Sequence, residues 1–198
     1  MKKGNEIPTI DVALVTIQVS EGDEVALDTA SKIAVSVQSE TEDSVKLVVK
    51  GKLIAQKPPV TTITGNTITL TDNVFNPEMV KILQGGTVKY WTSAEQSTEG
   101  DTDAGFGVSS YTPPVAGSDD KGSPFTLNAY SAIYNAAGLI TGYEKIAYPN
   151  CQGTPVALNS EDGVFRAPEY TINSAPKTGE APYKITYIQA LPVVSSGT

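Results

Sequence analysis

A short run near the middle of the chain, residues 66–86, changes from the pattern of a strand to that of a helix. Threonines at 67, 69 and 71 alternate with Ile68 and Leu70, as in a strand with one buried face. A strand that passes directly into a helix commits this part of the chain to a layer of sheet with a helix packed on it.

The helix is signalled at both of its ends. Asn76 is a good N-cap residue, and Pro77 occupies the first helical position, where its fixed φ fits. The pair at 85–86 is Gly-Gly, which accepts the left-handed conformation at a helix end. The side chains that share one face at spacings of three and four are Met79, Ile82 and Leu83. The pattern predicts a helix over about 76–84, and two turns are stable only when packed on other structure.

The rest of the chain has the composition of a β protein. Val, Ile and Thr make up 55 of the 198 residues, and these β-branched types suit a pleated, half-buried surface. The apolar fraction of 39% is far above that of a disordered chain. We therefore expect a mostly β protein in one domain, 1–198.

Several segments alternate or are rich in β-branched residues and predict strands. These are residues 9–19, 24–38, 44–55, 60–64, 87–91, 124–134, 143–151, 154–159, 164–172 and 183–191. The pair 124–134 and 143–151 is expected to form a hairpin. The acidic residues Glu40, Glu42 and Asp43 indicate an exposed hairpin tip. Gly51-Lys52 indicates a turn or bulge in the strand at 44–55, and Pro58-Pro59 should interrupt pairing.

Residues 94–122 differ from their surroundings. They are polar and glycine-rich, and carry six acids against Lys121 alone, a net −5 within a chain of net −8. Some 29 residues without periodicity are unusual inside a compact domain. The segment is interpreted as a polar arm or long loop, with a solvated loop as the simpler alternative. The acidic balance also argues against binding duplex nucleic acid.

Catalytic and metal-binding motifs are scarce. With no histidine in the sequence, Ser-His-Asp and Cys-His arrangements and histidine metal ligands are excluded. Cys151 is the one cysteine, so no intramolecular disulfide forms, and we interpret it as a small core or loop residue. No apolar run follows Lys2 and Lys3 as in a signal peptide, and none is long enough for a membrane span. We predict no enzyme activity, no catalytic, metal or cofactor residues, and no cofactor.

Three weaker patterns have simpler explanations, and a fourth stays open. Two Ser-x-x-Lys matches, at 118–121 and 174–177, sit among glycine and proline and are interpreted as turns. Asp101-Thr-Asp103 lacks the remaining ligands of a calcium loop. Tyr130 and Tyr134 share one strand face, and core packing or a protein contact is favoured over ligand stacking. Carboxylate pairs for glycoside hydrolysis meet only in a fold, so a hydrolase stays open.

Four segments together resemble a known family. Residues 68–86 read ITLTDNVFNPEMVKILQGG, residues 122–130 GSPFTLNAY, residues 143–155 YEKIAYPNCQGTP, and residues 165–182 FRAPEYTINSAPKTGEAP. They resemble the major tail proteins of phages and prophages of Gram-positive bacteria. The likeness covers most of the chain from residue 60 onward, and none of the segments is a functional signature.

This resemblance implies a tail tube protein, a structural virion protein assembled in the bacterial cytoplasm. The fold it implies is a tail-tube-like β-sandwich or barrel with the short helix, 76–84, at its edge. Six copies would form a ring, and stacked rings a tube whose lumen passes DNA without specific binding. The implied partners are further copies of the chain and other tail proteins, such as an initiator, a tape measure or a terminator. Contractile, non-contractile and bacteriocin-like tails all remain open.

The charge of the chain fits this implication. Arg166 is the one arginine of a net negative chain, and a protein that conducts DNA must not grip phosphates. A surface adhesion or carbohydrate-binding β-sandwich is the alternative. That class would also be acidic, threonine-rich and poor in cysteine, but it usually brings a signal peptide, an anchor, an aromatic platform or a calcium site.

Overall fold

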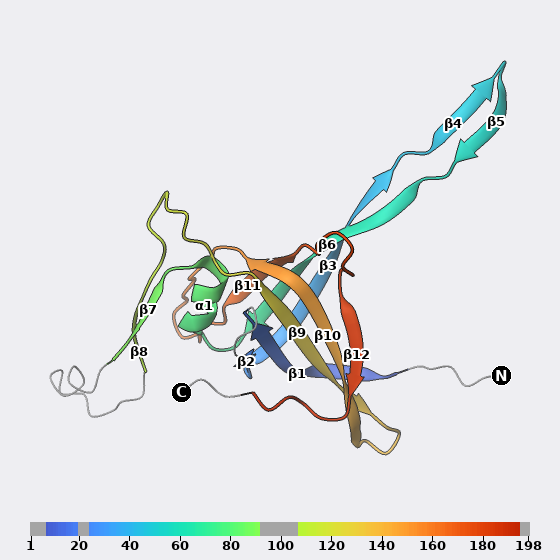
Figure 1. Cartoon of the computed structure of the whole chain (residues 1–198). Helices are drawn as coiled ribbons and strands as arrows, with labels where there is room; N and C mark the ends of the chain where they lie inside the picture. Colours follow the sequence, from blue (N-terminus) through green and yellow to red (C-terminus); the bar gives the residue numbers. More distant parts are fainter. Residues whose placement is uncertain (1–6, 20–23, 92–106, 195–198) are drawn as a thin grey trace.

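The computed structural model describes residues 7–19, 24–91 and 107–194 (Figure 1). Its elements in chain order are β1 Thr9–Gln18, β2 Glu24–Leu27, β3 Ala30–Glu42, β4 Val45–Val49, β5 Lys52–Lys57, β6 Val60–Asp72, α1 Pro77–Gln84, β7 Thr87–Tyr90, β8 Val108–Thr112, β9 Phe125–Tyr134, β10 Ile140–Gly153, β11 Glu169–Ser174 and β12 Lys184–Ile188. The protein is mostly β with a single short helix in the described ranges, which confirms the predicted fold class.

One antiparallel sheet of eight strands forms the body. Its order is β2-β1-β9-β10-β11-β6-β3, and β12 also pairs with β10. The sheet does not close into a barrel, but it curves enough for β1 to contact β3 although they are far apart in this order. The two halves of the sheet therefore face each other in the manner of a sandwich.

The core lies between these halves. Buried side chains from β1, β6, β9 and β11 meet there, with three from the helix. The fully buried apolar residues of this core include Val15, Ile17, Ile68, Leu70, Leu127, Ile172, Met79 and Leu83. The alternating Ile68 and Leu70 are fully buried as their pattern predicted, because both point from β6 into this core.

Strand β10 pairs with two different strands along one of its own edges. Tyr143 to Ala147 pair with β12, and Cys151 to Gly153 pair with β11. Between these stretches Asn150 has φ of 47°, and the register with β9 shifts between Tyr148 and Cys151. This bulge bends β10, so that it exchanges one neighbour for the other.

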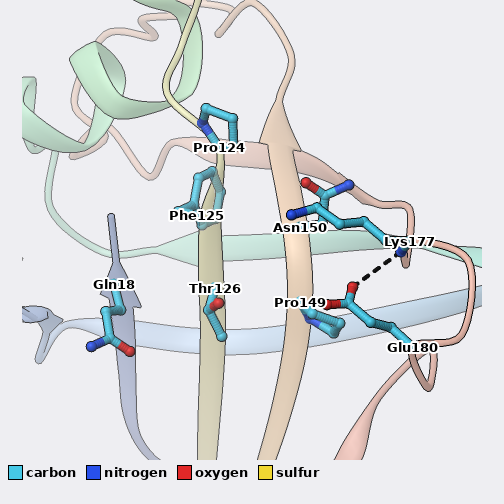
Figure 2. Close-up of a pocket in the computed structure, with 8 residues that line it drawn as sticks. All are labelled: Gln18, Pro124, Phe125, Thr126, Pro149, Asn150, Lys177 and Glu180. Atoms are coloured by element: carbon cyan, nitrogen blue, oxygen red, sulfur yellow. Dashed lines mark hydrogen bonds between the residues drawn. The ribbon is translucent and has the colours of Figure 1, made fainter. Parts of the chain in front are cut away.

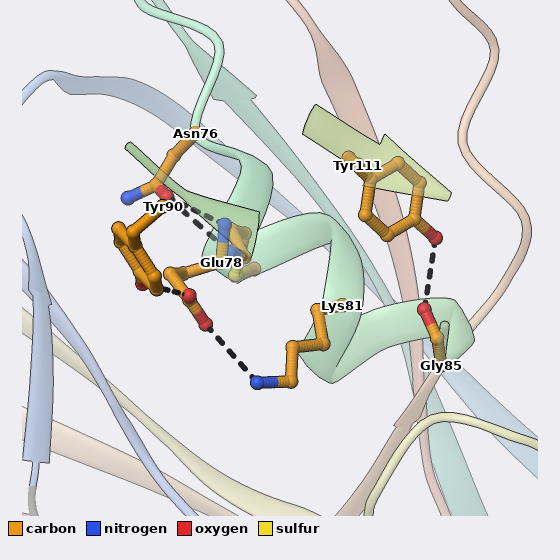
Figure 3. Close-up of polar contacts among 7 residues, drawn as sticks. Asn76, Glu78, Lys81, Gly85, Tyr90 and Tyr111 are labelled. Carbon is orange, nitrogen blue, oxygen red and sulfur yellow. Dashed lines mark hydrogen bonds and ion pairs between the residues drawn. The ribbon is translucent and has the colours of Figure 1, made fainter. Parts of the chain in front are cut away.

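The helix begins and ends as its sequence indicates. The Asn76 side chain accepts hydrogen bonds from the backbone N–H groups of Glu78 (3.0 Å) and Met79 (3.4 Å), as Figure 3 shows. Gly85 follows the last turn with φ of 84°. The hydroxyl of Tyr111, on β8, donates to the Gly85 carbonyl at 2.8 Å and fixes the helix end against the β7–β8 hairpin. The predicted helix is confirmed.

The polar segment 94–122 is described only from residue 107 onward, and residues 94–106 lie outside the described ranges. Within the described part, Val108–Thr112 form β8. The Asp120 carboxylate accepts from the Gly86 N–H at 3.1 Å, and the Ser123 N–H donates to the Ile82 carbonyl at 3.1 Å. This part of the segment is thus attached to the end of the helix.

Some of the strand and turn predictions were wrong. Of the predicted strand 164–172, only the part from Glu169 onward forms one, and residues 24–38 divide into β2 and β3. Residues 154–159 form no strand, because the Val156 N–H donates to the Gln84 side chain at 2.8 Å and the chain there packs on the helix. Residues 40–43 are not a hairpin tip. They lie midway along a longer hairpin whose turn is Lys50-Gly51, with φ of 47° and 79°. Two residues with positive φ make the type I′ turn that suits a two-residue hairpin.

We predict that Gly153→Ala destabilises the body. A Cβ at this position would lie 2.5 Å from the Leu83 Cα and Cβ, so the helix must move away from β10. The expected loss of unfolding free energy is about 1–3 kcal/mol, typical of overpacking, measured by urea denaturation. Gly107→Ala is the matched control, because its nearest neighbour atom would lie at 3.9 Å. Equal stability of the two variants would contradict this packing.

Candidate assembly interface

A hairpin arm extends from one end of the body (Figure 1). Strand β6 pairs with β11 only over Asn66–Thr71, so outward of Gly65 its described partner is β3 alone. The ladder of β3 and β6 continues to the pair Glu42–Val60, and β4 and β5 then carry the hairpin to its turn. We call residues 39–64 the arm and residues 45–57 the outer arm.

Side-chain contacts link the two strands of the arm. Lys57 and Glu42 form an ion pair at 2.9 Å, and the hydroxyls of Thr41 and Thr61 are hydrogen-bonded at 2.9 Å. Pro58 and Pro59 lie between β5 and β6, where pairing is interrupted as predicted. From Asp43 to the turn the arm extends about 26 Å, given a rise of about 3.3 Å per residue.

The outer arm exposes apolar side chains on both faces. Val45 is 65% exposed and Ile54 61% exposed. The large apolar residues exposed there are Val45, Leu47, Val48, Val49, Leu53 and Ile54. Because alternate residues of a strand point to opposite faces, Val45, Leu47 and Val49 lie on one face and Val48 on the other. An apolar two-stranded ribbon in water is marginally stable alone, so this surface is suited to burial against a partner.

Three sheet edges are also open in the described part of the chain. Strands β2 and β3 end the strand order, and β12 pairs on one side only. Ile185 and Tyr187 of β12 are both exposed. Unpaired edges with such side chains can accept a strand from another chain.

The cysteine and the two Ser-x-x-Lys matches lie in positions that fit a structural role. Cys151 is fully buried, and burial raises the pKa of its thiol to about 11. The Ser174 hydroxyl donates to the Pro149 carbonyl at 2.9 Å, while Lys177 is exposed in a turn. Lys121, of the other Ser-x-x-Lys match, is likewise exposed.

Packing accounts for the buried tyrosine of the pair, and the structure describes the acidic residues only in part. Tyr130 is buried, with the Lys145 ammonium 5.5 Å from its ring centre, which fits packing, while Tyr134 is half-buried. Asp101 and Asp103 lie outside the described residues. Among the residues that are described, no group of three His, Cys, Asp or Glu side chains could hold a metal ion. No helix in those same ranges is both long and apolar enough to cross a bilayer.

Three hollows that described residues line are small. Figure 2 shows one of about 210 Å³, lined by residues that include Pro124, Phe125 and Asn150. Two of its polar groups already have partners: the Asn150 amide donates to the Ala175 carbonyl at 2.6 Å, and the Glu180 carboxylate accepts from the Lys177 N–H at 3.1 Å. Hollows of about 260 and 290 Å³ lie beside the helix. All three are below the roughly 300–1,000 Å³ usual for ligand pockets.

The sequence could have indicated the arm more clearly. Residues 44–57 combine apolar runs with lysines, and the Lys50-Gly51 turn falls midway between them. The interpretation of 44–55 as a strand with a turn or bulge near Gly51 included the correct turn. The acidic residues at 40–43 were the misleading signal, because charge at a hairpin base looks like charge at a tip.

Comparisons with known proteins give little. No protein-family model matches the chain, and no curated protein matches it. Among solved structures, a chain from "Cryo-EM structure of the anti-feeding prophage (AFP) baseplate, 6-fold symmetrised" has a TM-score of 0.34 and 9% identity, over 92% of this chain and 97% of that one. A likeness of this size carries no argument, so the function must be inferred from the residues themselves.

We predict that Cys151 resists alkylation in the folded protein. Its raised pKa leaves about a hundredfold less thiolate at pH 8 than an ordinary thiol, and burial blocks access as well. Mass spectrometry after iodoacetamide treatment should show no adduct until denaturant unfolds the chain. Ser118→Cys, at an exposed position, is the positive control. Modification of native Cys151 at the rate of that control would contradict the burial.

Proposed function

We propose that this chain is a structural subunit of a phage particle, and more narrowly the subunit of a tail tube. Hexameric rings would form by sheet addition between copies, and the rings would stack into a tube that passes DNA. The observation that carries the proposal is the outer arm, an apolar ribbon exposed on both faces.

The energetics of the arm support assembly. Covering the half-exposed Val and Leu side chains of the outer arm would gain about 1 kcal/mol each. A partner on each face of the outer arm would bury the apolar side chains of that face. The open edges of β3 and β12 offer a second kind of contact, through backbone hydrogen bonds.

Charge supports the passage of DNA in this proposal. The chain has a net charge of −8, and its one arginine, Arg166, already donates to the Ser160 hydroxyl at 2.6 Å. A negative lumen repels phosphates and leaves DNA free to move. Within the same proposal the chain acts as a single domain, and the polar segment 94–122 is a further assembly element anchored at the helix end.

The sequence segments that resemble phage tail proteins lie in the body rather than in the arm. Residues 68–86 form the end of β6 and the helix, and residues 143–155 contain most of β10. These segments support a shared body, while the arm is the part that would define contacts between copies.

We predict that removing the arm's outer part abolishes assembly and keeps the body folded. Glu42 and Val60 are paired across the ladder, so Asn-Gly in place of residues 43–59 closes it with a two-residue turn. Wild-type protein should form rings or tubes in negative-stain microscopy and large particles in light scattering over a concentration series. The shortened protein should stay monomeric with an unchanged thermal transition of the body.

Point variants test the same idea without a deletion. Val45→Thr, Leu47→Thr and Val49→Thr together remove one apolar face while keeping β-forming side chains. Val193→Thr is the matched control, since Val193 is fully exposed and lies outside both the arm and the segment 94–122. Normal assembly of the triple variant and of the shortened protein, or a wild-type chain that is monomeric throughout and binds glycans, would contradict the proposal.

A further inference from the structure

Positive charge in this chain is concentrated on the outer arm. Its four lysines are Lys46, Lys50, Lys52 and Lys57, and it contains no acidic residue. The remaining 185 residues carry 22 acidic and 10 basic residues, a net charge of −12. An apolar and basic ribbon therefore projects from an acidic protein, which suits it to a surface that is both apolar and acidic.

Such a surface lies on a loop of the body. Residues 158–165, here called the acidic loop, include Glu161 and Asp162, and the Arg166 guanidinium that follows donates to the Ser160 hydroxyl within the loop, so residues 158–166 carry a net charge of −1. The same loop exposes Leu158, Val164 and Phe165, and Phe165 is 96% exposed. The Val164 N–H donates to the Glu161 carbonyl at 3.4 Å, so the two carboxylates sit in a turn beside the apolar side chains.

The acidic loop and the arm lie at opposite ends of the body. Just after the loop, the Pro168 carbonyl accepts from the Asp72 N–H at 3.0 Å, and the Arg166 guanidinium lies 5.6 Å from the Phe75 ring centre. Asp72 pairs with Ala30 at one end of the β3–β6 ladder, and the arm leaves from the other end. The outer arm of one copy therefore cannot reach its own acidic loop.

We propose that the outer arm of one copy docks on the acidic loop of a second copy, head to tail. The inference deepens the proposed function and rests on it, because it names the two surfaces that join one subunit to the next. A contact between two unlike surfaces repeats from copy to copy and produces rings or open stacks. Arm-to-arm pairing is disfavoured, because it would bring two sets of four lysines together.

Crosslinking tests the geometry. Gln56→Cys on the arm and Asn159→Cys on the loop keep every apolar and charged side chain named above, and buried Cys151 should not react. A mixture of the two full-length variants treated with a short bis-maleimide should give crosslinked dimers, and neither variant alone should. Crosslinking of the arm variant with itself would overturn the head-to-tail contact.

Charge reversal tests the chemistry. Lys50→Glu with Lys52→Glu, and separately Glu161→Lys with Asp162→Lys, should each raise the protein concentration needed for assembly about tenfold. The four changes combined should restore most of the wild-type behaviour. Lys89→Glu with Lys177→Glu is the control, with the same change of net charge at exposed sites away from both surfaces.

The outcomes separate this inference from the function that it rests on. Normal tubes from both charge-reversed variants would overturn the docking and leave the tail proposal standing, whereas a wild-type chain that never assembles would overturn both. Sedimentation of wild-type protein with phosphatidylserine vesicles or duplex DNA, lost in Lys50→Glu with Lys52→Glu while assembly is unchanged, would assign the arm to a lipid or nucleic acid and also overturn the docking.

Discussion

The pairing of β3 with β6 is the interaction on which the rest of the structure depends. At one end of this ladder, Ile68 and Leu70 of β6 are fully buried in the core beside the helix. At the other end, the same two strands leave the body and become the arm. The pairing carries the orientation of the core to the base of the arm, where the register shifts between Gln38 and Ser39, and the outer arm follows as a separate two-stranded ladder.

The position of the helix is determined by contacts on several of its sides. Gly153 lets β10 approach Leu83 closely, Asp120 receives the Gly86 N–H, and Tyr111 donates to the Gly85 carbonyl. Each contact comes from a different part of the chain. Val156, two residues before the acidic loop, is attached to the same helix through the Gln84 side chain, so this packing also places the start of the loop.

Sequence patterns predicted the elements with strong local signals. The cap at Asn76, the glycines at 85–86 and the alternation in β6 were sufficient for the helix and for that strand, and the β9–β10 hairpin followed from alternation too. The order of the strands and the open edges were not predictable, because they depend on pairings between distant residues. Residues 154–159 were misassigned since their partner is the Gln84 side chain, a contact that no local pattern records.

An exposed apolar ribbon can pair uncontrollably with other copies as well as form a specific contact, and its lysines affect both kinds of pairing. Lysine on an edge strand opposes uncontrolled pairing between identical strands, because each new pair places like charges together. The same lysines favour an acidic partner, so they discourage the wrong contact and encourage the intended one. A surface that was only apolar would join copies in many arrangements. In the proposed docking, opposite charges at the two ends of one subunit would select a single direction of contact, and such a contact gives a polymer its polarity.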